Sequence, residues 1–327
     1  MDPWRSNAFF IFQMTFFALY LFYLMFTIGV LMVMAPLYWV FDIFSSYVPI
    51  FTAASVVTIL LLVFYRRFMQ AAIIFVLVGY LSITLVIQYL PPEKPVTSPL
   101  DDRSTKLSVM QVNVNFRNTA YQKLLDSVGE ERPSVIVINE ATPGWSAELE
   151  TSLKSEYPYF ITESSETYQG MIVVSQLPIR MYDVIRFSEA SAPILKVEFR
   201  EPAMTLFAVH ALSPVSEQWA LERDGLLHSL VPILEQTDGM IIVAGDLNAT
   251  VHSTAIRGLL HDANLHDARR GFGWNATWMR NTPLAAAIDH VLYRGSAEVR
   301  DVRVLPDIGS VHRPLLVDMT IYPTELL

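Results

Sequence analysis

Three long apolar stretches without a charged side chain dominate the first 90 residues and constrain the fold most strongly. They cover residues 8–35, 48–65 and 69–90. A helix needs about 20 apolar residues to span a bilayer, and each stretch approaches or exceeds that length. Any one of them is compatible with a buried core helix, but three in succession favour membrane spans. The first is too long for a cleaved signal peptide, and no small-residue cleavage site follows it cleanly.

Charges beside these stretches predict their orientation. Arg66 and Arg67 form the only basic pair near any of them. The positive-inside rule places this turn in the cytoplasm, and Arg5 agrees. The aromatic segment 37–47 is expected to be a turn at the membrane interface. Three spans then predict an integral protein of a bacterial inner membrane with a periplasmic C-terminal domain.

Composition divides the chain into three parts. Residues 1–90 are the expected transmembrane anchor, and the proline-rich segment 91–103 is an expected extended linker. Residues 104–327 are enough for one sizeable domain. The chain has no cysteine, which excludes disulfides, a thiol nucleophile and cysteine-ligated metals.

Short apolar strands alternate with helical stretches in the C-terminal part. Strands are predicted at 107–114, 134–139, 171–175, 194–199, 204–209, 240–244, 288–292, 299–305 and 315–321, and helices at 120–129, 144–154, 216–234 and 253–260. Several strands follow one another without an intervening helix. This order indicates an α+β fold in which two sheets pack together under outer helices, rather than one parallel sheet.

The charge balance of the domain restricts its partners. After residue 100 there are 19 Lys and Arg against 29 Asp and Glu. Non-specific binding to nucleic acid rests on Lys and Arg that neutralise phosphates. An acidic domain can still hold a local basic groove, but the balance argues against a general nuclease.

Polar side chains stand at the ends of several predicted strands. The most informative run is Gly245-Asp246-Leu247-Asn248-Ala249-Thr250, which follows the apolar strand 240–244. Alternate side chains of a strand point to one side, so Asp246 and Asn248 are expected to lie together. A carboxylate can take or align a proton there, and a carboxamide can donate hydrogen bonds to phosphate oxygens.

Five further polar residues occupy comparable positions: Asn113, Glu140, His210, Asp289 and His312. Singly, each has a structural interpretation as a turn former, a helix N-terminal charge, a satisfied core histidine or a loop cap. Their number at strand ends favours one shared site.

In this order the residues resemble the motifs of the endonuclease/exonuclease/phosphatase family. That family includes deoxyribonuclease I, apurinic endonucleases, neutral sphingomyelinases and inositol polyphosphate 5-phosphatases. The resemblance runs from about residue 107 to residue 321, and the Gly-Asp-Leu-Asn-Ala-Thr and Ile-Asp-His-Val runs are its most specific parts. It implies a four-layer α/β/β/α sandwich behind the three transmembrane helices.

The resemblance also implies a metal and a base. Glu140 is the expected principal ligand of a divalent cation, with Asn113 beside it, and such oxygen ligands suit Mg²⁺ or Mn²⁺. The cation would neutralise a phosphate oxygen and orient it for in-line attack. His312 is the expected general base, held in the correct tautomer by Asp289.

The remaining polar residues complete the implied mechanism. Asp246 would align the nucleophile or protonate the leaving oxygen. Asn248 and His210 would donate hydrogen bonds to the charge that develops on the phosphate. One departure concerns the last motif, which usually reads Ser-Asp-His-x-Pro in the family, whereas this chain has Ser310-Val311-His312-Arg313-Pro314. Val311 cannot bind a metal, so either the metal affinity is lower or the metal lies wholly on the Glu140 side, and a non-catalytic member of the family stays an alternative to the favoured active enzyme.

The segment before Asp289 carries candidate substrate contacts. Trp274, Trp278 and Arg280 lie in a glycine-containing loop. The tryptophans could cover the site and stack on a base or enter the interface beside a lipid headgroup, or they could simply pack at a sheet edge. Arg280 is a candidate contact for a second phosphate.

These observations predict a membrane-anchored, divalent-metal-dependent phosphoesterase of the phosphodiesterase type, which uses water as the nucleophile. The tether and the acidic domain favour a phospholipid or its headgroup over nucleic acid as substrate, with the lipid bilayer as a partner. The alternatives are an extracytoplasmic endo- or exonuclease and a non-catalytic binding member of the family.

Overall fold

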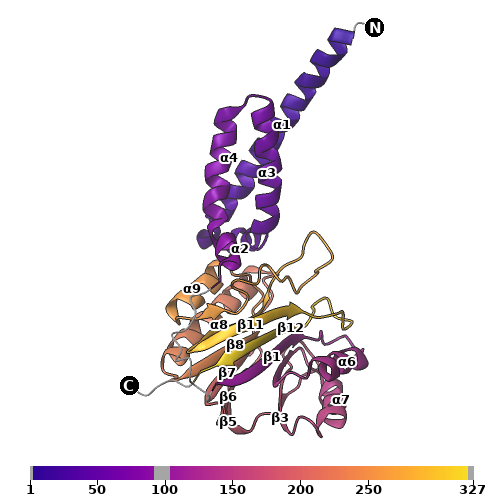
Figure 1. The fold of residues 1–327 in the computed structure, drawn as a ribbon, viewed down its shortest axis with the longest axis vertical. Coiled ribbons are helices and arrows are strands. Elements are labelled where there is room, and N and C mark those ends of the chain that lie inside the picture. The colour runs from indigo at the N-terminus through magenta and orange to yellow at the C-terminus, as the bar shows by residue number, and fades with distance from the viewer. Residues whose placement is uncertain (1–2, 92–103, 323–327) are drawn as a thin grey trace. The chain divides into compact units, whose positions relative to one another are not determined.

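The computed structural model describes residues 3–91 and 104–322 (Figure 1). It divides the chain into two compact units. One comprises Met1–Ile87 with His252–Thr254, and the other comprises Gln88–Val251 with Ala255–Leu327. Apart from Pro91, the predicted linker 91–103 lies outside the described residues.

The N-terminal unit is helical. Its elements are α1 (Pro3–Val33), the 3-10 helix η1 (Ala35–Leu37), α2 (Trp39–Ser45), α3 (Val48–Phe64), α4 (Phe68–Leu81) and α5 (Ile83–Tyr89). Within α1, the segment Phe9–Val33 is long and apolar enough to cross a membrane. The pairs α2–α3 and α4–α5 pass the same test only when each bent pair counts as one span, with bends of 69° and 51°.

Two details differ from the sequence-based expectation. The predicted stretch 69–90 is broken at Ser82, whose hydroxyl lies 2.7 Å from that of Thr52 on α3. A serine that bonds outside its own helix favours an interruption there. The predicted interfacial turn 37–47 is largely helical, because α2 occupies most of it. The exposed pair Arg66–Arg67 forms the turn between α3 and α4.

The other unit contains two six-stranded mixed sheets. The first has the order β11 (Ala297–Val304), β12 (Leu315–Ile321), β1 (Thr105–Asn113), β2 (Val135–Asn139), β4 (Met171–Ser175) and β3 (Tyr159–Glu163). The second has the order β5 (Ile179–Ile185), β6 (Ile194–Phe199), β7 (Met204–His210), β8 (Met240–Asp246), β10 (Asp289–Arg294) and β9 (His266–Asp267).

The sheets pack face to face and helices cover their outer faces. One apolar core joins inward side chains of both sheets, such as Val109 and Val137 of the first and Leu206 and Ile242 of the second. A second core lies between the first sheet and the helices α6 (Tyr121–Glu131) and α7 (Pro143–Leu153).

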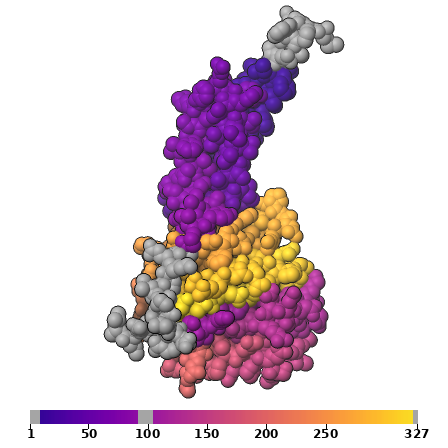
Figure 2. All heavy atoms as spheres, in the orientation of Figure 1, coloured from indigo at the N-terminus to yellow at the C-terminus, as the bar shows by residue number. Residues whose placement is uncertain are grey.

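A third core lies between the second sheet and the helices α8 (Glu217–Glu235) and α9 (Thr254–Asp262). Figure 1 shows the two helix pairs on opposite sides of the strands. The predicted α+β sandwich of two sheets with outer helices is therefore confirmed for this unit. In Figure 2 the yellow C-terminal strands lie between orange and magenta parts of the same unit, so distant segments share one surface.

Each sheet contains one parallel pair, and these pairs position the polar strand ends. β1 runs parallel to β2, and β7 runs parallel to β8. The helices α6 and α8 make the crossover connections that parallel pairs require. As a result Asn113 pairs with Asn139, and His210 pairs with Asp246. The antiparallel partner β10 places Asp289 opposite Asp246.

Candidate active site

Asn113 links the two carboxylates at the centre of the candidate site. Its amide nitrogen donates to Glu140 Oε1 over 2.9 Å and to Asp246 Oδ2 over 3.0 Å. The second oxygen of Glu140 accepts from the Phe116 backbone N–H at 3.1 Å. Asn113 and Asp246 are buried, whereas Glu140 remains partly accessible. Three strand ends from two sheets therefore meet in one cluster.

His312 and Asp289 form a hydrogen-bonded pair beside this cluster. His312 Nδ1 lies 2.9 Å from Asp289 Oδ2, and His312 Nε2 lies 3.6 Å from Asp246 Oδ2. Because an ionised carboxylate only accepts, Nδ1 carries the proton and Nε2 is the basic nitrogen of neutral His312. The Ser310 hydroxyl fixes the loop, since it accepts from the His312 backbone N–H and donates to the Asn113 carbonyl.

His210 points its other ring nitrogen at the same acids. Its Nδ1 donates to the Tyr168 carbonyl over 3.0 Å, while Nε2 lies 3.9 Å from Glu140 and 4.0 Å from Asp246. Burial lowers the pKa of His210, which favours the neutral ring. In that state Nε2 is an acceptor, so His210 donates to a phosphate oxygen only after it gains a proton.

The turn after β8 is shaped by Asn248, which has a positive φ of 50°. Its backbone N–H donates to Asp246 Oδ1, and its amide nitrogen donates to the Ala211 carbonyl, both over 2.9 Å. The amide group carries two hydrogens, and within the part of the chain that the structure describes the second one has no acceptor. The geometry therefore keeps one Asn248 N–H for a ligand.

Burial and mutual charge set the protonation of the centre. Burial raises the pKa of Asp246 to about 7, against the smaller lowering effects of His312 and Asn113. Burial alone would lower the pKa of His312, but Asp289 and Asp246 together raise it to about 9. For Asp289, burial raises the pKa, but His312 together with hydrogen bonds from Thr277 and Gln111 holds it below its usual range. The raised pKa of Asp246 reflects its burial, and a further positive charge beside its oxygens would favour the ionised form.

The donor set fits a hard divalent cation. Carboxylate oxygens of Glu140 and Asp246 are the ligands that Mg²⁺ and Mn²⁺ prefer, and a cation would favour the ionised form of the buried Asp246. Ligand atoms of Asp246, Asp289 and His312 also lie within 4.8 Å of one another. Since His312 and Asp289 already bond each other, the Glu140 side is the better place. There Asn113 presents its amide nitrogen, while its oxygen accepts from the Asn115 backbone N–H.

Two buried amides that the sequence prediction missed support the centre. Asn139 Oδ1 accepts from the Asp246 backbone N–H over 2.9 Å and from Gln111 Nε2 over 3.0 Å. Asn139 Nδ2 reaches the Val209 carbonyl on β7 over 3.3 Å, which joins the two sheets. The signal in the sequence is a polar residue at a position where its strand is otherwise buried and apolar.

The predicted substrate contacts lie at different distances from the centre. Trp278 forms backbone bridges to Ala286 and to His312, so it borders the base. Arg280 is exposed and donates to the Val304 carbonyl. No contact among the described residues joins Trp274 or Arg280 to the cluster. Their roles stay predictions.

Val311, which breaks the usual motif, does not enter the buried cluster. Its side chain is 53% exposed, and its carbonyl accepts from the Met279 backbone N–H at 3.0 Å. The position next to His312 is thus an open, apolar point on the surface, and its chemistry can be changed without repacking the core.

The family model that matches the chain is that of the Endonuclease/Exonuclease/phosphatase family. It covers residues 110–312, which is more than half of the chain and includes nearly all of the strand ends described above. The chain belongs to this family. No curated protein sequence matches it.

Solved structures share the fold of the domain at low sequence identity. Humanized D. rerio TDP2 has a TM-score of 0.55 at 18% identity, over 65% of this chain and 98% of that one. An endonuclease/exonuclease/phosphatase from Beutenbergia cavernae has a TM-score of 0.54 at 18% identity, over 66% and 72%. Sphingomyelinase C from Streptomyces griseocarneus has a TM-score of 0.51 at 18% identity, over 65% and 99%.

Proposed function

We propose that this protein is a membrane-anchored phosphodiesterase that depends on a divalent cation and uses water as its nucleophile. The observation that carries the proposal is the buried assembly in which Asn113 joins Glu140 to Asp246, beside the His312–Asp289 pair. Membership of the Endonuclease/Exonuclease/phosphatase family supports the same reaction class.

The described geometry supports a definite division of labour. Because the pKa of His312 is about 9, the ring can act as a base only when it is neutral, either above that pH or when the charge of a bound cation lowers the pKa. Neutral Nε2 then takes the proton of the attacking water, and Nδ1–H stays bonded to Asp289. Asp246, 3.6 Å from Nε2, orients that water or returns a proton to the leaving oxygen. Asn248 donates its remaining amide hydrogen to the phosphate, and His210 does so once it is protonated.

Glu140 and Asp246 would hold Mg²⁺ or Mn²⁺, while Asn113, whose amide nitrogen faces both carboxylates, would orient them rather than bind the ion. The bound cation would neutralise negative charge on the phosphate. The matching electrostatic observation is the raised pKa of Asp246.

A phospholipid or its headgroup is the substrate that we favour. The apolar helix α1 supports membrane association, and the surplus of acidic residues disfavours long contacts with nucleic acid. One similar structure is a sphingomyelinase. A nuclease is the alternative, because D. rerio TDP2, of similar fold, has been solved with a single-strand DNA product.

We also propose the orientation. If each bent helix pair forms one span, three spans and a cytoplasmic Arg66–Arg67 turn place the catalytic domain outside the cytoplasm. In a bacterium this compartment is the periplasm.

A substrate panel tests the proposal. The detergent-purified protein is offered bis(p-nitrophenyl) phosphate, phospholipids and single-stranded DNA, with Mg²⁺, Mn²⁺ or chelator. We expect metal-dependent release of headgroup from lipid and little cleavage of DNA. DNA cleavage in preference to lipid, weakening steeply with salt, would establish the nuclease instead. Turnover of none of the three would support a non-catalytic binding protein.

A further inference from the structure

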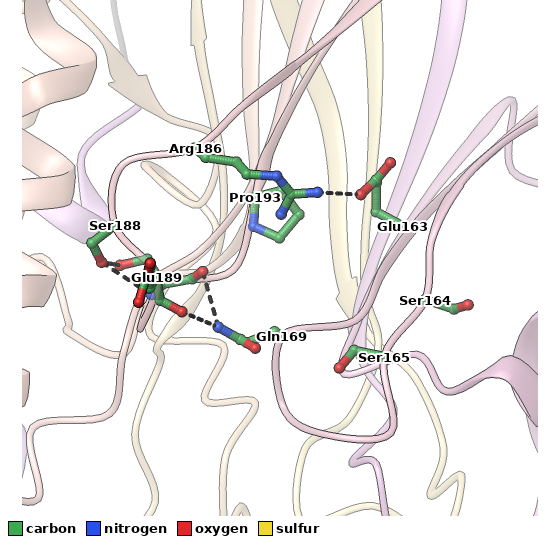
Figure 3. A pocket seen from close by; sticks show the side chains of 9 residues that line it. Glu163, Ser164, Ser165, Gln169, Arg186, Ser188, Glu189 and Pro193 are labelled. Carbon is green, nitrogen blue, oxygen red and sulfur yellow. Dashed lines mark hydrogen bonds and ion pairs between the residues drawn. The ribbon is translucent and has the colours of Figure 1, made fainter.

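A cleft lined mainly by polar residues lies between two loops, one of which supplies the Tyr168 carbonyl that binds His210. It has a volume of about 530 Å³, within the range of small-molecule sites. Its walls are the loop between β3 and β4 and the loop between β5 and β6. The lining residues are Glu163, Ser164, Ser165, Gln169, Arg186, Ser188, Glu189, Ser191 and Pro193 (Figure 3).

The first wall also carries contacts to the candidate active site. Ser165 donates its backbone N–H to the carbonyl of Ala141, the residue after Glu140. Tyr168 of the same loop supplies the carbonyl that binds His210 Nδ1. The cleft and the candidate active site therefore share one supporting loop.

Side-chain bonds hold the two walls together. Gln169 Nε2 donates to the carbonyls of Glu189 over 2.7 Å and Ser191 over 3.3 Å. The Tyr168 hydroxyl donates to the Ala190 carbonyl over 3.1 Å, and within the second wall the Ser188 hydroxyl donates to that of Ser191 over 3.1 Å. These cross-links preform the cleft before any ligand arrives, which lowers the entropic cost of binding.

The chemistry of the lining excludes several ligand classes. None of its residues is aromatic, so it can neither stack a nucleobase nor form the aromatic cage that recognises choline. It has one cation against two carboxylates, and that cation, Arg186, is paired with Glu163 at 2.7 Å. A second phosphate would therefore meet excess negative charge.

What the lining offers is a dense set of neutral and paired hydrogen-bonding groups. The serine hydroxyls and the Gln169 carbonyl oxygen suit alcohol groups. Arg186 is 63% exposed and is bonded through one nitrogen to one oxygen of Glu163, as Figure 3 shows. The other guanidinium N–H groups of Arg186 and the second oxygen of Glu163 can therefore bond to the hydroxyl groups of a ligand.

We propose that this cleft binds a neutral polyol portion of the substrate, such as a glycerol or hexose unit, while the attached phosphodiester occupies the catalytic centre. This assignment rests on the proposed function and sharpens it, because it selects phospholipids with hydroxylated headgroups over choline lipids and over nucleic acid. Arg186 and Glu163 are the specificity-determining residues.

Direct binding tests the assignment. The full chain carrying His312→Ala, which removes the base and so prevents turnover, is prepared with Mg²⁺ in a detergent without a sugar headgroup. Saturation-transfer NMR then measures its affinity for glycerophosphoglycerol, dimethyl phosphate and methyl phosphocholine. We expect glycerophosphoglycerol to bind most tightly, with magnetisation transfer to its glycerol protons.

Two further variants localise that binding. Arg186→Gln is expected to weaken the affinity for glycerophosphoglycerol by about tenfold or more, because it removes hydrogen bonds to a charged group. The affinity for dimethyl phosphate should stay unchanged. Arg300→Gln, a matched control on β11 that is also exposed and paired with a glutamate, should change neither. Equal affinity for dimethyl phosphate, preference for the choline ester, or indifference to Arg186→Gln would each overturn the assignment. Failure of the unaltered protein to hydrolyse any ester would contradict the proposed function. The binding measurement would still test the cleft, because it does not depend on turnover.

Discussion

At the residue scale, two histidines in the same cluster are held in opposite ways. His312 gives its Nδ1–H to the carboxylate of Asp289, whereas His210 gives its Nδ1–H to the neutral carbonyl of Tyr168. The carboxylates of Asp289 and Asp246 raise the pKa of His312, and burial lowers the pKa of His210. Environment rather than residue type therefore separates the proposed base from the proposed phosphate ligand.

Restoring an acid next to the base should strengthen metal binding. Val311→Asp places a negative charge at an exposed position beside His312. Attraction to this carboxylate should strengthen the binding of a nearby divalent cation by about 1 kcal/mol. We expect the Mg²⁺ concentration for half-maximal activity to fall by about fivefold, measured by metal titration of hydrolysis. Val311→Asn is the neutral control of similar shape, and an equal shift in both variants would rule out the electrostatic explanation.

The sequence allowed most of the central residues to be predicted, but not their supports. Asn113, Glu140 and Asp246 follow recognisable strands, and their meeting point follows from parallel strand ends. Asn139 was missed because the carboxylate next to it offered the simpler interpretation of that strand end. The supporting carbonyl of Tyr168 carries no side-chain signal at all, since any residue there offers the same group.

At the element scale, the close contact between β7 and β8 should be sensitive to a single methyl group. A Cβ on Gly245 would lie 1.7 Å from the Val209 carbonyl oxygen. Gly245→Ala should therefore lower the free energy of unfolding by about 2–3 kcal/mol, as overpacked cores do. Urea denaturation of the detergent-solubilised protein measures this.

A second glycine provides the control for this prediction. Gly258 lies in α9, and a Cβ there would meet nothing within 4 Å. Gly258→Ala should raise the free energy of unfolding by up to about 1 kcal/mol, since alanine is the better helix former. Equal stability of the two variants would show that β7 and β8 are not so close.

The buried hydrogen bonds of His290, a residue of β10, predict that the free energy of unfolding depends on pH. His290 Nε2 donates to the Ala249 carbonyl, and Arg269 donates to His290 Nδ1. Burial, together with Arg269, lowers the pKa of His290 to about 4. The unfolded chain binds this proton more readily, so the fold loses up to about 3 kcal/mol as the pH falls from 6.5 to 4.

The variant His290→Gln isolates that contribution. Its free energy of unfolding should fall less between pH 6.5 and pH 4 than that of the unaltered protein, even if it is less stable at neutral pH. His261→Gln is the control, because His261 is exposed at the end of α9. Parallel pH curves for His290→Gln and the unaltered protein would refute the prediction.

The sequence predicted the buried strands better than the edges. β8 and β2 are continuous apolar runs, which is typical of strands covered on both faces. β5 was missed because most of it is exposed at a sheet edge and its pattern is irregular, and β9 has only two residues. β3 was also missed, because only one of its residues is fully buried and apolar alternation is weak. In the N-terminal unit, hydropathy did not reveal the break at Ser82.

At the scale of the whole molecule, an apolar helical part and an acidic two-sheet domain share one chain. If the proposed function is correct, such an arrangement would hold the domain at a membrane surface, where a lipid substrate is concentrated. We expect the catalytic domain to lie outside the cytoplasm. Protease added to intact spheroplasts should therefore digest the domain, and protease added to inverted vesicles should leave it intact. Protection in spheroplasts with digestion in inverted vesicles would reverse the assigned orientation.

The most direct test of the central claim is hydrolysis of bis(p-nitrophenyl) phosphate by the full chain with Mg²⁺ or Mn²⁺ and with chelator. Glu140→Gln, His312→Ala and Asp289→Asn are measured beside it, and Asp301→Asn on β11 serves as a surface control. Our account predicts turnover that chelator abolishes, that each of the three site variants lowers by about 100-fold or more, and that Asp301→Asn leaves unchanged. Metal-independent turnover, or turnover that survives in Glu140→Gln and His312→Ala, would contradict it.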